Sequence, residues 1–87
     1  MRQITIQLAN DEGLHARPAG ILVKVASRYN CKIELSAKGQ IKNAKSIMNI
    51  LALGLEKGDE FHISADGVDE VEALESLQNL IQSNFEI

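Results

Sequence analysis

The segment from Gly13 to Pro18 contains the residue types that phosphoryl chemistry requires. His15 stands just before a stretch whose apolar residues recur at helical spacing, and the first backbone N–H groups of a helix have no partner within it. Those N–H groups and the positive end of the helix dipole attract an anion. Arg17 adds a guanidinium that can hold two phosphate oxygens at once. These residue types could therefore form a phosphate site around His15, with His15 as nucleophile.

The helix start and Arg17 both disfavour a charged imidazolium at His15. A neutral imidazole keeps a lone pair that can attack phosphorus, and the new phosphoryl oxygens then lie among donors that are already in place. The alternative is that His15 only caps the helix and that Arg17 is an ordinary surface charge. On residue types and spacing alone that structural alternative is favoured, and only the family resemblance given below reverses this preference.

Ser46 is the second candidate site. It precedes a short apolar segment that stops before Gly54, which predicts a helix from Ser46 to Leu53 with the serine as N-cap and the glycine just beyond the end. A serine cap stabilises a helix by about 0.5–2 kcal/mol over alanine. A phosphate on this hydroxyl would lie at a helix N-terminus, where negative charge is tolerated.

The same short helix has more apolar residues than one buried stripe can hold. We expect Ile47, Met48 and Leu51 to be exposed near His15 and to form a docking face for partner proteins. The alternative is that the helix is buried between its neighbours on several sides.

The elements that position these residues follow from the hydrophobic pattern. Alternation predicts strands at 4–8, 31–36, 41–43 and 60–65, with turns at 37–40 and 66–67. Helical spacing predicts helices over 16–29, over 46–53 and from about 69, the last with a buried stripe of Val71, Leu74, Leu77, Ile81 and Phe85. The order β-α-β-β-α-β-α predicts an α/β (α+β) open-faced sandwich, in which three helices cover one face of a four-stranded antiparallel sheet.

Length and composition limit the possible functions. We expect residues 1–87 to form a single domain that is too small for an enclosed active-site cavity. The net charge is −3 and no Lys/Arg run is present, which argues against nucleic acid or a membrane surface as partner. The longest fully apolar run, 50–53, is far too short to span a membrane, and we expect no signal peptide, because Met1 and Arg2 lead into an alternating segment. A cytoplasmic protein is expected.

Two further reactive residues are expected to have no chemical role. Cys31 has no second cysteine for a disulfide and no companions for a metal site, so we expect a small buried hydrophobe. His62 alternates onto the solvated face of its strand, with no acid or cysteine grouped with it locally. No metal or organic cofactor is implied.

The segment from Gly13 to Pro18 resembles the active-site signature of the HPr family, the histidine-containing phosphocarriers of the bacterial phosphoenolpyruvate:sugar phosphotransferase system. The similarity continues through 45–48, 53–54 and 63–67 and covers essentially the whole chain. It implies that His15 accepts phosphate on Nδ1 from enzyme I and donates it to the A domains of sugar permeases, while Arg17 steadies the phosphoryl group. Such a protein is a stoichiometric carrier and does not turn over a small substrate alone.

Residues 45–48 look like the subset of the family that is typical of low-GC Gram-positive bacteria. That similarity implies phosphorylation of Ser46 by an ATP-dependent serine kinase/phosphorylase and contact with a catabolite-control transcription factor. Asn49, where glycine is usual, and Gly20, where a larger residue is common, depart from the subset and bear on partner choice. The alternatives are a corepressor-like interaction module on the same fold that binds a transcription factor, and a regulatory domain that binds a small molecule.

Overall fold

The computed structural model describes residues 1–86 and has the predicted element order. The sheet order is β1-β4-β2-β3, and all three neighbouring pairs are antiparallel. The elements are β1 (Arg2–Gln7), α1 (Ala16–Ala26), β2 (Cys31–Ala37), β3 (Gln40–Asn43), α2 (Ile47–Ala52), β4 (Glu60–Gly67) and α3 (Glu70–Gln82).

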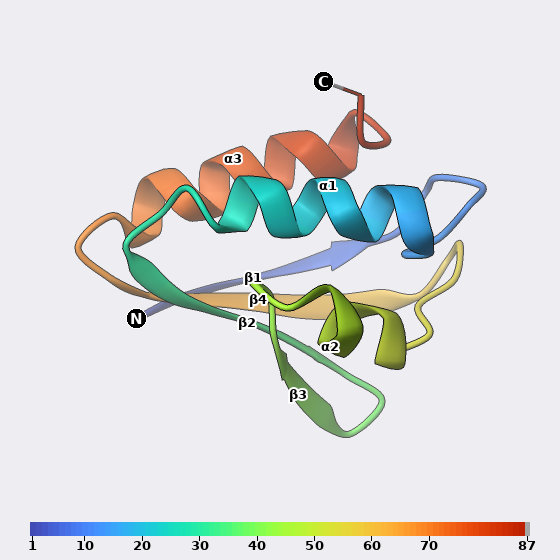
Figure 1. The fold of residues 1–87 in the computed structure, drawn as a ribbon, viewed down its shortest axis with the longest axis horizontal. Coiled ribbons are helices and arrows are strands. Elements are labelled where there is room, and N and C mark those ends of the chain that lie inside the picture. Colours follow the sequence, from blue (N-terminus) through green and yellow to red (C-terminus); the bar gives the residue numbers. More distant parts are fainter. Residues whose placement is uncertain (87) are drawn as a thin grey trace.

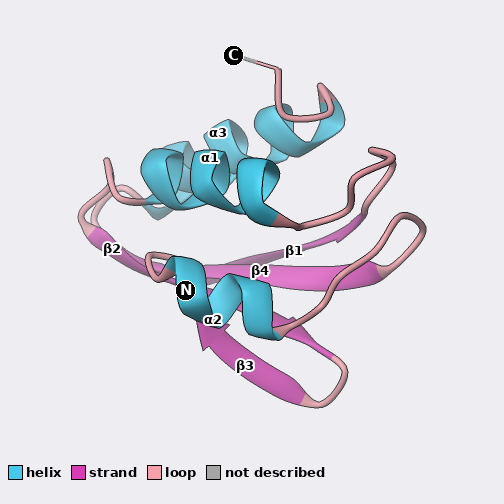
Figure 2. Cartoon of the chain, turned by 45° about the vertical axis from the view of Figure 1, so that its right-hand side comes forward, coloured by secondary structure: helices cyan, strands magenta, loops and turns pink. Residues whose placement is uncertain are grey.

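One face of the sheet is covered by helices and the other is open. Both views show α1 and α3 side by side over the sheet, with α2 beside the β3 edge (Figures 1 and 2). Because α2 also contacts α1, all three helices belong to one layer. The open-faced sandwich that the sequence predicted is confirmed.

The alternation of the strands sets which side chains enter the core. Ile4, Ile63 and Leu35 are neighbours across β1, β4 and β2, and they point into the helical layer. Thr5 and His62 occupy the next row, on the open face. Complete burial of an aliphatic side chain stabilises the fold by about 1.5–3 kcal/mol, so this register is strongly specified.

The β2–β3 hairpin and α2 end where the sequence predicted. Lys38 and Gly39 both have positive φ, 53° and 76°, as the two central residues of a tight hairpin turn of type I′ require. Ser46 is the N-cap of α2, and Gly54 follows its C-cap with φ 60°. Both ends of the short helix are therefore determined locally.

Two element ends differ clearly from the predictions, those of α1 and β4. Helix α1 ends at Ala26, before the predicted end at Tyr29. Strand β4 continues through 66–67, where a turn was predicted, because Gly67 pairs with Cys31 of β2. A Cβ at Gly67 would lie 2.5 Å from the Cβ of Cys31, so this pairing needs a glycine.

The buried stripe of α3 also differs from the prediction. Val71 is 42% exposed, because the buried positions 73, 74, 77, 80 and 81 define a stripe that leaves it on the flank. Phe85 is buried as predicted, but it lies beyond the helix, where Asn84 and Phe85 have positive φ. There its amide donates to the carbonyl of Leu80 at 2.8 Å.

Candidate functional site

His15 is the N-cap residue of α1, but its side chain makes no capping hydrogen bond. Its carbonyl accepts from the amide of Ala19 at 2.8 Å, which is the first helical hydrogen bond. Pro18, the third helical residue, has no N–H, so Ala16 and Arg17 supply the free amides of the first turn. The helix therefore starts at the predicted place, while the imidazole is not used to cap it.

The imidazole of His15 is exposed and bonded to an acid. Its Nε2 lies 2.9 Å from Oε2 of Glu56, and 58% of each side chain is accessible. An ionised carboxylate can only accept, so Nε2 donates this hydrogen bond. In the neutral ring the lone pair then lies on Nδ1, which is the nitrogen available for attack.

Arg17 is not directed at His15. Its Nη2 donates to Oε1 of Glu12 at 2.7 Å, and both side chains are exposed. This contact raises the pKa of the Arg17 guanidinium further above its ordinary value, so the side chain stays charged. The sequence predicted that the Arg17 charge acts beside the imidazole, whereas in the structure each of the two residues is paired with a separate carboxylate.

Two chain segments come together to build the site. The amide of Leu14 donates to the carbonyl of Leu55 at 2.9 Å. Gly13 has φ 67°, and a Cβ there would lie 2.6 Å from the Leu55 oxygen and 2.9 Å from the Cα of Glu56. Only glycine allows this approach, because any side chain would clash with the backbone opposite. The loop before α1 and the segment after α2 are thus held against each other.

Ser46 has the capping role that the sequence predicted. Its Oγ accepts from the amide of Asn49 at 3.4 Å, and the residue is partly buried. The neighbouring Lys45 has its Nζ bonded to the carbonyl of Tyr29 at 2.7 Å. Ser46 is therefore the cap of α2, in contrast to the uncapped start of α1.

The predicted exposure of the apolar side of α2 is confirmed. Ile47, Met48 and Leu51 are 40%, 74% and 38% exposed, whereas Ile50 is buried. The alternative, a helix buried on several sides, is therefore wrong. We call Ile47, Met48 and Leu51 the α2 patch. It continues onto α1, because a Cβ at Gly20 would lie 3.7 Å from Cδ1 of Ile47.

A shallow hollow of about 440 Å³ follows the exposed side of α1. It begins beside the site, at Ala16 and Arg17, and extends along the helix. Its lining residues are Ala16, Arg17, Gly20, Ile21, Val23 and Lys24. A partner that covers the α2 patch and this hollow would lie next to His15.

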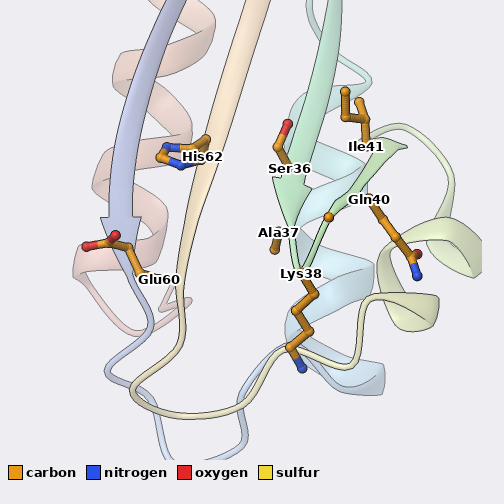
Figure 3. A pocket seen from close by; sticks show the side chains of 8 residues that line it. Ser36, Ala37, Lys38, Gln40, Ile41, Glu60 and His62 are labelled. Atoms are coloured by element: carbon orange, nitrogen blue, oxygen red, sulfur yellow. The ribbon is translucent and has the colours of Figure 1, made fainter.

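The two residues expected to lack a chemical role lie away from this site. Cys31 is buried, and burial together with the Asp69 carboxylate raises its thiol pKa to about 11. His62 lies on the open face, where its Nδ1 is 2.8 Å from Oγ1 of Thr5. It borders an open depression of about 460 Å³ with Glu60 and the β2–β3 hairpin (Figure 3).

Among residues 1–86, no three His, Cys, Asp or Glu side chains are grouped as a metal site would need. No helix in the same part of the chain is long and apolar enough to cross a membrane.

Comparison with known proteins identifies the family. The family model described as "PTS HPr component phosphorylation site" matches residues 2–83. The phosphocarrier protein HPr of Treponema pallidum is 42% identical over 82 residues, which cover 94% of this chain and 93% of the relative. The chain therefore belongs to the HPr family, the phosphocarriers of the phosphotransferase system.

Solved structures agree with this assignment. HPr-C-His from Thermoanaerobacter tengcongensis matches with a TM-score of 0.96 and 43% identity, and the match covers 100% of both chains. The catabolite repression containing protein Crh of Bacillus subtilis also matches over 100% of both chains, with a TM-score of 0.77 and 37% identity. That protein forms an intertwined, swapped dimer.

Proposed function

We propose that His15 is the residue that carries the phosphoryl group, received from enzyme I and passed to the A domains of sugar permeases. One observation carries this proposal. The imidazole is exposed at the start of α1, makes no capping bond, and is held through Nε2, so that Nδ1 is free. The family assignment supports phosphoryl transfer as the reaction class, and this geometry supports Nδ1 as the attacking atom.

In the acceptance step the Nδ1 lone pair attacks phosphorus. A phosphorus–nitrogen bond forms as the bond between phosphorus and the donor breaks, and the ring becomes cationic with its proton on Nε2. The transferred group has negative charge on its three peripheral oxygens, so catalysis depends mainly on placement and on electrostatic stabilisation. The free amides of Ala16 and Arg17 are the donors nearest to His15 in the chain, and the positive end of the helix dipole adds to their attraction for the phosphoryl group.

Arg17 becomes available to the phosphoryl group by leaving Glu12. Their ion pair is exposed, and exposed pairs contribute little to stability. A phosphoryl group has more negative charge than one carboxylate and offers three acceptor oxygens. We therefore expect the guanidinium to turn from Glu12 to the phosphoryl oxygens once His15 is loaded.

The α2 patch is the proposed docking surface for partner proteins, and Ser46 is the proposed substrate of a serine kinase. Exposed aliphatic and methionine side chains adapt to several surfaces, so Ile47, Met48 and Leu51 would contact both enzyme I and the permease domains. An ATP-dependent serine kinase would phosphorylate Ser46 at the edge of this patch. The added charge would then weaken docking without unfolding α2.

The test of the carrier proposal is phosphorylation by enzyme I and phosphoenolpyruvate, followed by intact-mass measurement. We expect one acid-labile phosphoryl group in the wild type and none in His15→Ala. His62→Ala is the matched control, because it removes the other histidine of the chain. Undiminished labelling of His15→Ala, or loss of labelling in His62→Ala, would contradict the assignment.

The similarity to Crh, a catabolite repression protein, supports a second role, the interaction with a catabolite-control transcription factor that the sequence resemblance implies. This role would use the α2 patch with phosphorylated Ser46 and would not need His15. Binding of kinase-treated His15→Ala to such a factor tests it. Equal binding of kinase-treated His15→Ala and wild type supports the second role, whereas absence of binding by both excludes it.

A further inference from the structure

We propose that Glu56 is a positioning residue for phosphoryl transfer: its carboxylate holds His15 as the Nε2–H tautomer and stabilises the positive ring after Nδ1 is phosphorylated. This inference rests on the proposed role of His15 and deepens it. It comes from the 2.9 Å contact between Glu56 Oε2 and His15 Nε2, which joins residues 41 positions apart in the chain.

The backbone of Glu56 is fixed, although its side chain is exposed. Its amide donates to Oδ2 of Asp59 at 2.9 Å, and its carbonyl accepts from the amide of Asp59 at 3.0 Å. Residues on both sides are also bonded to the other segment, through Leu55 to Leu14 and through Gly58 to Leu8 at 2.8 Å. The Cα of Glu56 is therefore held beside the loop that carries His15, and only the carboxylate arm is free to move.

Before transfer, the contact determines which nitrogen is the nucleophile. A neutral imidazole carries its proton on one nitrogen and its lone pair on the other. The carboxylate accepts from Nε2–H and cannot donate, so it stabilises the form with the lone pair on Nδ1. The ring is also held in one orientation, which lowers the cost of reaching the geometry of attack.

After transfer, the contact stabilises charge. Bond formation at Nδ1 makes the ring cationic, with the proton on Nε2 facing the Glu56 carboxylate. In the donation step the phosphorus–nitrogen bond breaks, its electron pair returns to Nδ1, and the ring leaves as neutral imidazole. Without the Nε2 proton the ring would have to leave as an anion, which is a much poorer leaving group. Glu56 therefore favours the form that can give up its phosphoryl group.

The two nearby cations, Arg17 and Lys57, are each bonded to an acid other than Glu56. Arg17 is bonded to Glu12, and Glu86 also raises the pKa of that guanidinium. Lys57 donates to Oδ1 of Asp11 at 2.8 Å. Each cation is thus paired with a separate acid, and Glu56 is the carboxylate that contacts the imidazole.

The variants Glu56→Gln and Glu56→Lys test the proposal in graded steps. Glutamine keeps the size and removes the charge, whereas a lysine ammonium can only donate and opposes a proton on Nε2. Glu75→Gln is the matched control, because it removes the same charge from an exposed position on α3. All three changes are at exposed side chains, so the fold should be unaffected.

The first measurement is the tautomer of unphosphorylated His15, from the ¹⁵N shifts of its ring nitrogens in alkaline solution. The second is the rate at which phosphohistidine, prepared with phosphoramidate and without enzyme I, loses phosphate to water at neutral pH. We expect the Nε2–H fraction to fall from wild type to Glu56→Gln to Glu56→Lys. We also expect hydrolysis to slow by about twofold to fivefold in Glu56→Gln. This is the range of effect that the loss of an exposed ion pair has.

Glu75→Gln should match the wild type in both measurements. An equal tautomer fraction in the wild type and both Glu56 variants would overturn the proposal, as would unchanged hydrolysis in Glu56→Gln. The tautomer measurement needs no phosphate, so it is separate from the carrier role. Equal uptake of phosphate from phosphoramidate by His15→Ala and the wild type would instead overturn the proposed role of His15.

Discussion

The two helix starts of this protein place similar polar residues in opposite situations. At α2, Ser46 Oγ accepts from the amide of Asn49, so the side chain stabilises its own helix. At α1, His15 has the same N-cap position but makes no capping bond, and its ring reaches Glu56 on another segment. A capping side chain contributes stability, whereas an N-cap residue that leaves its helix uncapped is free for chemistry. The polar side chain at the start of α2 thus stabilises the fold, whereas the one at the start of α1 is available for chemistry.

The sharpest way to test this comparison is to remove the charge beside the uncapped site. Arg17→Ala should slow phosphoryl transfer by about tenfold or more, because a phosphoryl group would lose a charge-assisted hydrogen bond. Stability should hardly change, since Arg17 and its ion-pair partner Glu12 are both exposed. Quenched time courses of phosphoryl transfer from enzyme I measure the rate, and thermal unfolding measures the stability.

Lys57→Ala is the control for Arg17→Ala, because it removes a neighbouring cation that is paired with Asp11. Wild-type transfer rates in both directions for Arg17→Ala would contradict this role.

The opposite pattern is expected at the capped site. Ser46→Ala should lower the free energy of unfolding by about 0.5–2 kcal/mol, because the amide of Asn49 loses its acceptor. For a domain of this size each kcal/mol lowers Tm by about 4–8 °C. Phosphoryl acceptance by His15 should stay at the wild-type rate. A variant with unchanged stability would show that the 3.4 Å contact contributes nothing.

A smaller effect separates docking from stability at the same position. Ser46→Asp should keep or raise Tm, because aspartate also caps helices and its charge lies at the positive end of α2. Its apparent affinity for enzyme I should fall by about threefold, since the new charge adjoins the exposed Met48 of the α2 patch. Titration of transfer rate against carrier concentration gives this affinity. If the variant and the kinase-treated protein are phosphorylated as fast as the wild type, Ser46 is only a cap.

Local patterns were sufficient to predict most of this fold. Strand alternation and helical spacing predicted the element order and the faces of the sheet. The serine cap and Gly54 predicted both ends of α2, because capping depends on residues close in the chain. The exposure of the α2 patch followed from a simple excess of apolar residues over buried positions.

The differences at the site and at the end of β4 arise from contacts between distant residues. Glu56 lies 41 positions from His15, and no spacing rule joins a loop before one helix to a segment after another. The extension of β4 through Gly67 depends on its pairing with Cys31, which the local turn signal could not show. The contact between Arg17 and Glu12 could have been predicted, because opposite charges only five residues apart in the chain can pair.

The hydrogen bond from the Leu14 amide to the Leu55 carbonyl also determines how the site can open. The ring of His15 and the carboxylate of Glu56 belong to segments that this bond joins, directly beside both residues. Any fluctuation that moves the two segments apart must expose the Leu14 amide to solvent. Amide hydrogen exchange at Leu14 would therefore report the free energy of site opening, separately from the global unfolding measured at core strands. A slow rate at this amide would describe a carrier whose site is assembled before any partner arrives.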